Sequence, residues 1–582
     1  MQIRKSWKMH IVLCCLLLAM LLAITACSAP QAEEASSPAQ TATPAPEPSA
    51  EATTPAASSA PTQGTEDAEA EMLTDFTARQ AAHAQADKEI AGEFAAEEYT
   101  PESPLVIPDP YGESPLTAMV LFQTPEPTSA EITVKGKDDA TSISHEFNKS
   151  VTEHRLPVYG LYADTLNEVA IILKSEDGTT TEHTVSIQTA ALPGDISKAE
   201  VRTAQPEKMA DGLTFFDCPH LNGNYALAVD ANGDIRWYLT DKNLNFGMNM
   251  SFMENGNFIV GSGNVQPGGY NNLQSVIELS PLGKFVREYE IYSLHHDVRE
   301  KSNGNLIMAA SMEGRESQND YIVEVDRQTG EILDSWDLME ILPMSVFDTQ
   351  PPYSGGLNNW LHNNGLWYIE EEDALLISGR HQNLVAKIDA KTKELIWAFS
   401  QTVGELNEEM RPYLLEPADG EFEYPTSQHA PMLLPDGRLM LFDNRNQMET
   451  PEDGAELDQE LLYSRAVIYS IDEENQTIAQ DWQFGKERQD LYSSFASDVD
   501  YLGENHYMID FGGMYVKEDG THYDHLFTPP EIKFASSRTS VVVELLNDEI
   551  VFEVLLYGNE NSNSSKAERH VIYQNAQEIT LG

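Results

Sequence analysis

Residues 296–311, HDVREKSNGNLIMAAS, together with YIVEVDRQTGEILDSW at 321–336, establish the architecture of this chain. The first stretch places an Asn-Gly dipeptide between two apolar runs, which is the strongest local signal for a tight β-hairpin. The second stretch predicts another strand pair of the same kind. Together they predict a unit of four antiparallel strands.

The same unit returns twice, at 362–380 (HNNGLWYIEEEDALLISGR) and at 429–445 (HAPMLLPDGRLMLFDNR), and each copy opens on a histidine. His296, His362 and His429 are 66 and then 67 residues apart. We therefore expect them at equivalent places of successive units.

Six such units are expected between about residue 211 and the end of the chain. The other three contain YALAVDANGDIRWYL (225–239), MSFMENGNFIVGS (250–262) and SDVDYLGENHYMIDFGG (497–513). Closing such sheets into a ring removes exposed edges, so the predicted fold is all-β, with a six-bladed β-propeller domain over 211–582. The segment RHVIYQ (569–574) either belongs to the last blade or closes the ring.

Residues 104–194 show short alternating strands separated by Gly, Pro, Asp and Asn. Strands of this length and spacing predict a small antiparallel β-sandwich domain. Leu192-Pro193-Gly194 marks a linker that leaves it.

The N-terminus predicts export. Arg4, Lys5 and Lys8 precede an apolar run at 11–24, which is too short for a membrane span and has the layout of a secretory signal. The run ends in Ile-Thr-Ala-Cys, which resembles a bacterial lipoprotein box with Cys27 as the lipidated first residue of the mature protein. An ordinary cleaved signal is the alternative. We expect an extracytoplasmic protein that is lipid-anchored to the bacterial cell envelope.

Residues 28–103 are expected to form a disordered linker rich in Ala, Pro, Ser and Glu, which cannot bury enough apolar surface to fold. Within it, composition predicts a helix at 71–96 with few apolar residues, either exposed or docked on a partner.

Charge and cysteine content exclude several functions. The formal net charge of −58 argues against nucleic acid and against an anionic membrane surface as partners, so membrane contact is expected through the lipid anchor alone. Of the four cysteines, Cys14, Cys15 and Cys27 lie in or at the end of the signal. Only Cys218 remains, so the mature chain has no intrachain disulfide. The sequence leaves open whether the protein forms a homodimer.

Histidines at one place of a ring of blades would meet at its axis. Three imidazoles there can bind zinc with a water as fourth ligand, or can fill the channel and bond bridging water. Arg380 ends the second strand of the His362 hairpin, and its permanent charge opposes a metal cation. Three histidines and one arginine suit an oxyanion better, so we expect neither a metal nor a cofactor.

Four motifs carry a family resemblance: His-His-Asp at 295–297, Trp-Leu-His-Asn-Asn at 360–364, Ser-Gly-Arg at 378–380 and Gln-His at 428–429. In this order, after a sandwich domain, they resemble the bacterial aryl-sulfate sulfotransferase family over about residues 105–570. The stretch PYGESPLTAMVLFQT at 110–124 is similar to the N-terminal domain of that family. Periplasmic members carry a disulfide near the active site, which this chain cannot form.

The resemblance implies nucleotide-independent transfer of a sulfuryl group from an aryl sulfate donor to a phenolic acceptor through a sulfohistidine intermediate. It implies that His429 is the covalent residue, that His296, His362 and Arg380 bind sulfate and transfer protons, and that Asn364 contacts the sulfate. His295 rivals His296 for proton transfer, because neighbouring residues of a strand point to opposite faces. The alternatives are a non-catalytic surface-binding lipoprotein and a metal-dependent hydrolase or lyase with a three-histidine site.

Overall fold

The computed structural model describes residues 63–218, 224–241, 250–262, 275–345, 358–418, 422–446, 462–517, 520–523, 537–558 and 562–581. The predicted signal, Cys27 and the linker up to residue 62 lie outside the described residues. Every strand pairing in the named sheets is antiparallel except one short parallel pair, β22 with β26. The predicted all-β class is confirmed for the part of the chain that the structure describes.

The N-terminal domain is one five-stranded sheet in the order β1-β2-β4-β5, with β3 paired to β2. Its strands are β1 (Leu105–Pro108), β2 (Thr117–Val134), β3 (Ile143–Tyr159), β4 (Leu166–Ser175) and β5 (Thr180–Gln188). The sequence predicted short strands in this domain, whereas β2 runs without interruption from Thr117 to Val134. Pairing with β3 resumes at Thr128 after a break in register that follows Gln123, so the strand bends without ending.

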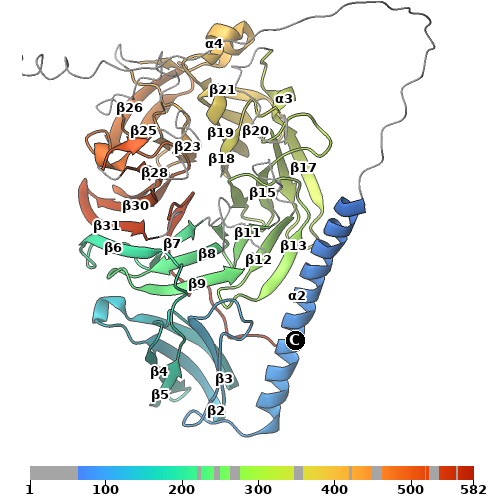
Figure 1. The fold of residues 1–582 in the computed structure, drawn as a ribbon, viewed down its shortest axis with the longest axis vertical. Helices are drawn as coiled ribbons and strands as arrows, with labels where there is room; N and C mark the ends of the chain where they lie inside the picture. Colours follow the sequence, from blue (N-terminus) through green and yellow to red (C-terminus); the bar gives the residue numbers. More distant parts are fainter. Residues whose placement is uncertain are drawn as a thin grey trace, which may run out of the picture. The chain divides into compact units, whose positions relative to one another are not determined.

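Six further sheets follow in the described part of the chain: β32-β7-β8-β9, β10 to β13, β14 to β17, β18 to β21, β23 to β26 with β22, and β27-β28-β30-β31-β6 with β29. Figure 1 shows them following one another around a common centre. In all six, the third and fourth strands of the meander contain a break in register, as at Glu278/Leu279 and Glu324/Val325. Such bulges increase strand twist, and their recurrence supports a repeated unit.

The strand β6 (Lys198–Ala204) belongs to the last of these sheets. The strands that follow it in the chain are β7 (Leu213–Cys218), β8 (Asn224–Val229), β9 (Ile235–Asp241), β10 (Ser251–Phe252), β11 (Phe258–Ser262), β12 (Ser275–Leu279), β13 (Phe285–Tyr289), β14 (Val298–Glu300), β15 (Leu306–Ala310), β16 (Tyr321–Val325) and β17 (Ile332–Asp337). The later strands are β18 (Asn363–Ile369), β19 (Ala374–Gly379), β20 (Leu384–Asp389), β21 (Leu395–Phe399), β22 (Glu416–Pro417), β23 (His429–Leu433), β24 (Leu439–Asp443), β25 (Arg465–Asp472), β26 (Thr477–Phe484), β27 (Asp498–Gly503), β28 (His506–Val516), β29 (His522–Tyr523), β30 (Ser537–Leu546), β31 (Glu549–Tyr557) and β32 (Ala567–His570). The helices are α2 (Gln63–Ala96), α3 (Leu338–Ile341), α4 (Val403–Leu406), η1 (Asp139–Thr141), η2 (Arg380–Gln382), η3 (Glu408–Tyr413) and η6 (Gln489–Leu491).

The two ends of the sheet-forming region are joined by strand pairing. The late strand β32 pairs with β7, and Asp217 in β7 accepts 2.8 Å hydrogen bonds from the backbone N–H groups of Ser565 and Lys566. The first two residues of the segment 569–574 lie in β32 and pair with β7, and its remaining residues follow that strand. β6 pairs with β31, although the sequence placed the start of this region near residue 211. That start was predicted too late because KAEVRTA, the sequence of β6, has too few apolar residues to signal a strand.

Apolar side chains are buried between neighbouring sheets. One cluster combines Ile307 and Trp336 of the β14–β17 sheet with Leu375 and Ile377 of the β18–β21 sheet. Other clusters fill the next two spaces between sheets. Because the faces of neighbouring sheets supply the hydrophobic core, the strand ends near the common centre of the six sheets can carry polar residues.

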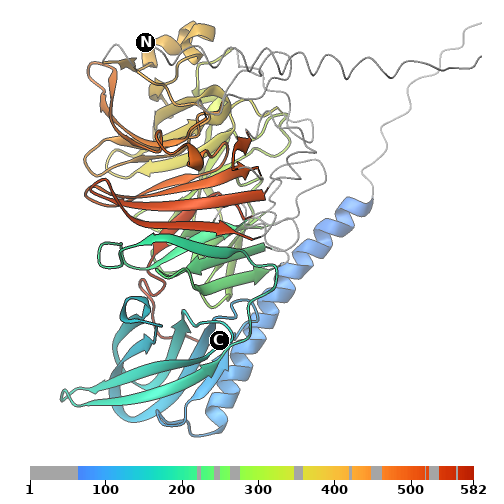
Figure 2. The same cartoon turned by 60° about the vertical axis from the view of Figure 1, so that its left-hand side comes forward.

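The helix α2 begins earlier than residue 71, where the sequence predicted its start, so this part of the expected linker is ordered. One face of the helix packs on its own chain, because Phe76, His83, Asp87, Ile90 and Phe94 are buried. Both views show α2 beside the N-terminal domain (Figures 1 and 2). Asp87 accepts from Tyr111 Oη at 2.8 Å and from Lys284 Nζ at 2.7 Å. The helix thus connects that domain to the β12–β13 turn, a contact that local composition does not reveal.

Among the described residues, no helix is both long and apolar enough to cross a membrane.

Candidate active site

The predicted site residues lie where the innermost strands of three consecutive sheets begin. His296 precedes β14, His362 precedes β18, and His429 is the first residue of β23. The backbone of His296 has φ = 68° and that of His362 has φ = 53°, in the left-handed region that histidine visits more readily than most residues. Such strained entry turns are typical of functional sites.

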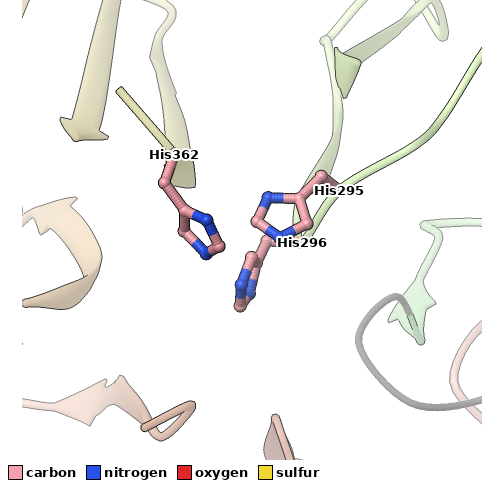
Figure 3. Close-up of side chains that lie close together, drawn as sticks. All are labelled: His295, His296 and His362. Atoms are coloured by element: carbon pink, nitrogen blue, oxygen red, sulfur yellow. The ribbon is translucent and has the colours of Figure 1, made fainter. Parts of the chain in front are cut away.

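The structure brings the three predicted histidines together. The ring centroid of His296 lies 5.2 Å from that of His429 and 6.4 Å from that of His362. His295 joins them, with ring centroids 4.3 Å from His296 and 4.6 Å from His362 (Figure 3). His295 and His296 therefore both face the cluster, because the turn at His296 interrupts the alternation of a regular strand.

His362 and His429 do not occupy strictly equivalent places. In β18, Asn363 pairs with Gly379 before a bulge in which two residues oppose one, and in β23 His429 pairs with Phe442 before the same kind of bulge. His429 therefore corresponds to Asn363, one residue beyond His362.

Arg380 begins the short helix η2 directly after β19 and is 5% exposed. Its backbone N–H donates to the carbonyl of His362 at 3.1 Å, and its Nη1 donates to His381 Nε2 at 3.3 Å. The ring of His381 lies 4.5 Å from that of His362. Sequence analysis missed His381; its position next to Arg380 was the only signal.

The cluster is neutral at physiological pH. Burial first, and the charge of Arg380 second, lower the pKa of His429 to about 3. Burial lowers the pKa of His295 to about 4 and holds those of His296 and His362 well below their ordinary value. An unprotonated imidazole keeps a lone pair that can attack or accept a proton.

Three asparagines bond to the Nδ1 atoms of His429, His295 and His362. His429 Nδ1–H donates to Asn444 Oδ1 at 2.6 Å, and His295 Nδ1–H donates to the carbonyl of Asn363 at 2.9 Å. His362 Nδ1 instead accepts from the side-chain amide of Asn359 at 2.7 Å. Sequence analysis missed Asn444 and Asn359. Asn359 lies just before the Trp-Leu-His motif, while Asn444 lies 15 residues beyond His429 and gives no local signal.

Asn364 is buried, and its side-chain amide donates to the carbonyl of Gln428 at 2.7 Å. It thus holds the residue that precedes His429. The expected contact between Asn364 and sulfate remains a prediction.

Among the described residues, His295, His296 and His362 form a group close enough to hold a metal ion, since one ring nitrogen of each lies within 4.8 Å of the others. The zinc site considered from the sequence consisted of His296, His362 and His429. The donor set suits a cation poorly. With Nδ1 accepting from Asn359, neutral His362 presents an N–H and not a lone pair, and Arg380 adds a positive charge nearby.

We therefore expect a chelator to leave activity unchanged, and the purified protein to hold less than one metal ion per chain, because neither His362 nor Arg380 favours a cation. Activity after prolonged dialysis against EDTA, with elemental analysis of the same sample, measures this. Activity that disappears on chelation and returns with one particular metal would contradict it.

The fold and the site together define a class, a mostly β protein with a buried or half-buried cluster of neutral histidines beside one arginine. The model of the family described as Arylsulfotransferase (ASST) matches residues 198–565, and that of the Arylsulfotransferase Ig-like domain matches residues 105–190. The chain belongs to the arylsulfotransferase family, which confirms the resemblance carried by the four motifs. It is an enzyme, a transferase of sulfur-containing groups, and its N-terminal domain is Ig-like.

The chain is also similar to curated proteins. It is 25% identical to arylsulfate sulfotransferase AssT of Lelliottia amnigena over 70% of this chain and 84% of that protein. It is 24% identical to AssT of Escherichia coli O6:H1 (strain CFT073) over 76% of this chain and 90% of that protein. Among solved structures, the β-propeller domain of Cps50 (Swd1) from Myceliophteria thermophila is 11% identical over 55% of this chain and 98% of its own, with a TM-score of 0.27, too low to support an argument.

Proposed function

We propose that this enzyme transfers a sulfuryl group from an aryl sulfate ester to a phenolic acceptor, without a nucleotide donor, through a sulfohistidine on His429. One observation carries the proposal. His429 is buried and neutral, its Nδ1–H is bonded to Asn444, and its Nε2 therefore bears the lone pair. The positive charge of Arg380 acts on this ring, where it lowers the pKa, and supplies positive potential for a sulfate.

In the first half of the reaction, His429 Nε2 attacks sulfur. An N–S bond forms, the bond between sulfur and the aryl oxygen breaks, and the electron pair leaves with the phenolate. Transfer of a group of this kind spreads negative charge over its outer oxygens, so fixed donors lower the barrier more than covalent assistance does. Arg380 and His362 Nε2–H are the donors assigned to those oxygens.

Protonation of the leaving phenolate, and deprotonation of the acceptor in the second half, require one further imidazole. His296 is assigned this role and His295 is its rival. The Nε2 of His295 has no hydrogen-bond partner among the described residues, which leaves it able to take a proton. The same proton is returned in each cycle, so the overall transfer is balanced.

We expect phenol-dependent release of a chromogenic donor phenol with ping-pong kinetics, because a covalent intermediate divides the reaction into two half-transfers. Initial rates over a grid of donor and acceptor concentrations should give parallel double-reciprocal lines. Intersecting lines, or activity with a nucleotide sulfate alone, would contradict the proposal.

Two further proposals concern the whole chain. The six sheets are taken as six blades of one propeller, which the β32–β7 pairing supports because it joins the last part of the chain to the first of these sheets. The lipoprotein-like segment before Cys27 supports a lipid anchor and an extracytoplasmic location. Metabolic labelling with a tagged fatty acid, compared between the parent and Cys27→Ser, tests the anchor.

A further inference from the structure

We propose that Asn444 and Asn359 are positioning residues that hold His429 and His362 in opposite tautomers, one presenting a lone pair and the other an N–H. This inference rests on the proposed function and assigns each histidine its part in it. Neutral imidazole has one donor and one acceptor nitrogen, so the partner of Nδ1 decides what Nε2 presents.

The orientation of Asn444 is fixed by three contacts. Its side-chain nitrogen donates to the carbonyls of Ser493 and Ala496 at 2.9 and 3.1 Å, and carbonyls can only accept. Its oxygen must therefore face His429, 2.6 Å from Nδ1. Asn444 is fully buried, so no water competes for this bond. His429 Nε2 is left as the lone-pair nitrogen.

The carbonyls that hold Asn444 are themselves fixed. Ser464 Oγ donates to the carbonyl of Ser493 at 3.0 Å, and the N–H of Gly513 donates to Ser493 Oγ at 2.7 Å. Ala496 and Ser497 have φ angles of 54° and 86°, in the left-handed region. A strained turn with this much hydrogen bonding indicates that its shape has a use beyond connecting strands.

Asn359 has the reverse role at His362. It is 6% exposed, and its side-chain nitrogen lies 2.7 Å from His362 Nδ1. Its side-chain oxygen accepts from Asn319 at 3.4 Å, and its backbone carbonyl accepts from His381 Nδ1–H at 2.6 Å. Because an amide nitrogen only donates, His362 Nδ1 accepts and Nε2 carries the proton.

These tautomers match the chemistry. An attacking nitrogen needs its lone pair, and the sulfated ring that forms keeps its Nδ1–H on Asn444 Oδ1, whose dipole favours the positive charge of that ring. A sulfate oxygen needs a donor, which His362 Nε2–H supplies. If the two tautomers were exchanged, His429 Nε2 would carry a proton and could not attack, and His362 Nε2 would turn a lone pair toward the sulfate.

The test replaces asparagine with aspartate at both positions, Asn444 and Asn359. In Asn444→Asp, one carboxylate oxygen still accepts from His429 Nδ1–H, so the tautomer is kept, while the other oxygen faces the carbonyls of Ser493 and Ala496 and lowers the melting temperature. The carboxylate also raises the pKa of His429, and since the ring must be neutral to attack, the acid limb of the kcat profile should move to higher pH. In Asn359→Asp, the carboxylate demands an Nδ1–H from His362, so Nε2 loses its proton and the donor KM should rise about 10- to 100-fold.

A second readout does not depend on turnover. In Asn359→Asp, the rings of His295, His296 and His362 can all present lone pairs, and their nitrogens are already within 4.8 Å of one another. Zn²⁺ should therefore bind this variant at least about tenfold more tightly than it binds the parent. Asn444→Asp carries the same added charge but should bind Zn²⁺ like the parent. Competition with a chromogenic zinc indicator measures both.

Asn167→Asp is the matched control for the same substitution at a buried asparagine, since Asn167 is 3% exposed and bonds to backbone groups in the Ig-like domain. It should lower the melting temperature without moving the pH profile or zinc affinity. Equal behaviour of the two aspartate variants in pH profile and zinc binding would overturn the inference. If the parent shows no transfer at all, the proposed function fails, and the zinc comparison still decides the tautomers.

Discussion

His429→Ala is expected to abolish both the burst of phenol and the mass label that the parent shows when donor is added without acceptor. The parent should release one phenol per active chain and become heavier by one sulfuryl group on the peptide that contains Gln428 and His429. Removing a nucleophile should cost about 10⁴-fold or more in turnover. The structure supports this size of effect because His429 Nε2 carries a lone pair in a buried, neutral ring.

The control for this prediction is His296→Ala. Its ring lies 5.2 Å from that of His429, so the substitution changes the same cluster without removing the nucleophile. This variant should turn over slowly yet still label with a donor whose phenolate leaves easily, because such a leaving group needs little protonation. A sulfuryl group found on His296 or His362 instead of His429 would overturn the assignment, even with the enzyme class unchanged.

Arg380→Lys is expected to lose roughly 10²- to 10³-fold in kcat, as when a transition-state donor is removed. The charge is kept, but an ammonium cannot reproduce the planar pair of donors that a guanidinium offers to two sulfate oxygens. The substitution also removes the 3.3 Å bond from Nη1 to His381. Steady-state kcat and KM for one chromogenic aryl sulfate measure the effect.

Arg380→Met separates charge from geometry. Because the charge of Arg380 lowers the pKa of His429, removing it should raise that pKa and move the acid limb of activity to higher pH. The lysine variant should keep the parental acid limb. A lysine variant nearly as active as the parent would mean that Arg380 acts only as a distant charge.

Local patterns predicted much of the sheet architecture. The turn at Asn303 and Gly304 lies between β14 and β15, and the turn at Asp436 and Gly437 lies between β23 and β24. Hairpins of this kind are encoded by residues a few positions apart, so one sequence suffices to recognise them. The spacing of the three histidines predicted that they would meet, because each opens the same kind of unit.

Other features were beyond local patterns. The pairing of β6 with β31 joins residues about 350 positions apart, and the buried face of α2 is defined by the domains that cover it. The positions of His295 and His381 depend on a turn and on a short helix whose geometry has no periodic signal.

The sequence by itself determined the all-β class, the repeated four-stranded unit and the convergence of His296, His362 and His429, because these follow from short-range turn chemistry and from repetition. Only the tertiary structure decided what each ring presents to a substrate. Asn444 faces His429 because carbonyls of a turn beyond β26 hold its amide, and Asn359 donates to His362 through a side chain that no spacing rule identifies. A tautomer is set by the partner of one nitrogen, and that partner is chosen by three-dimensional packing.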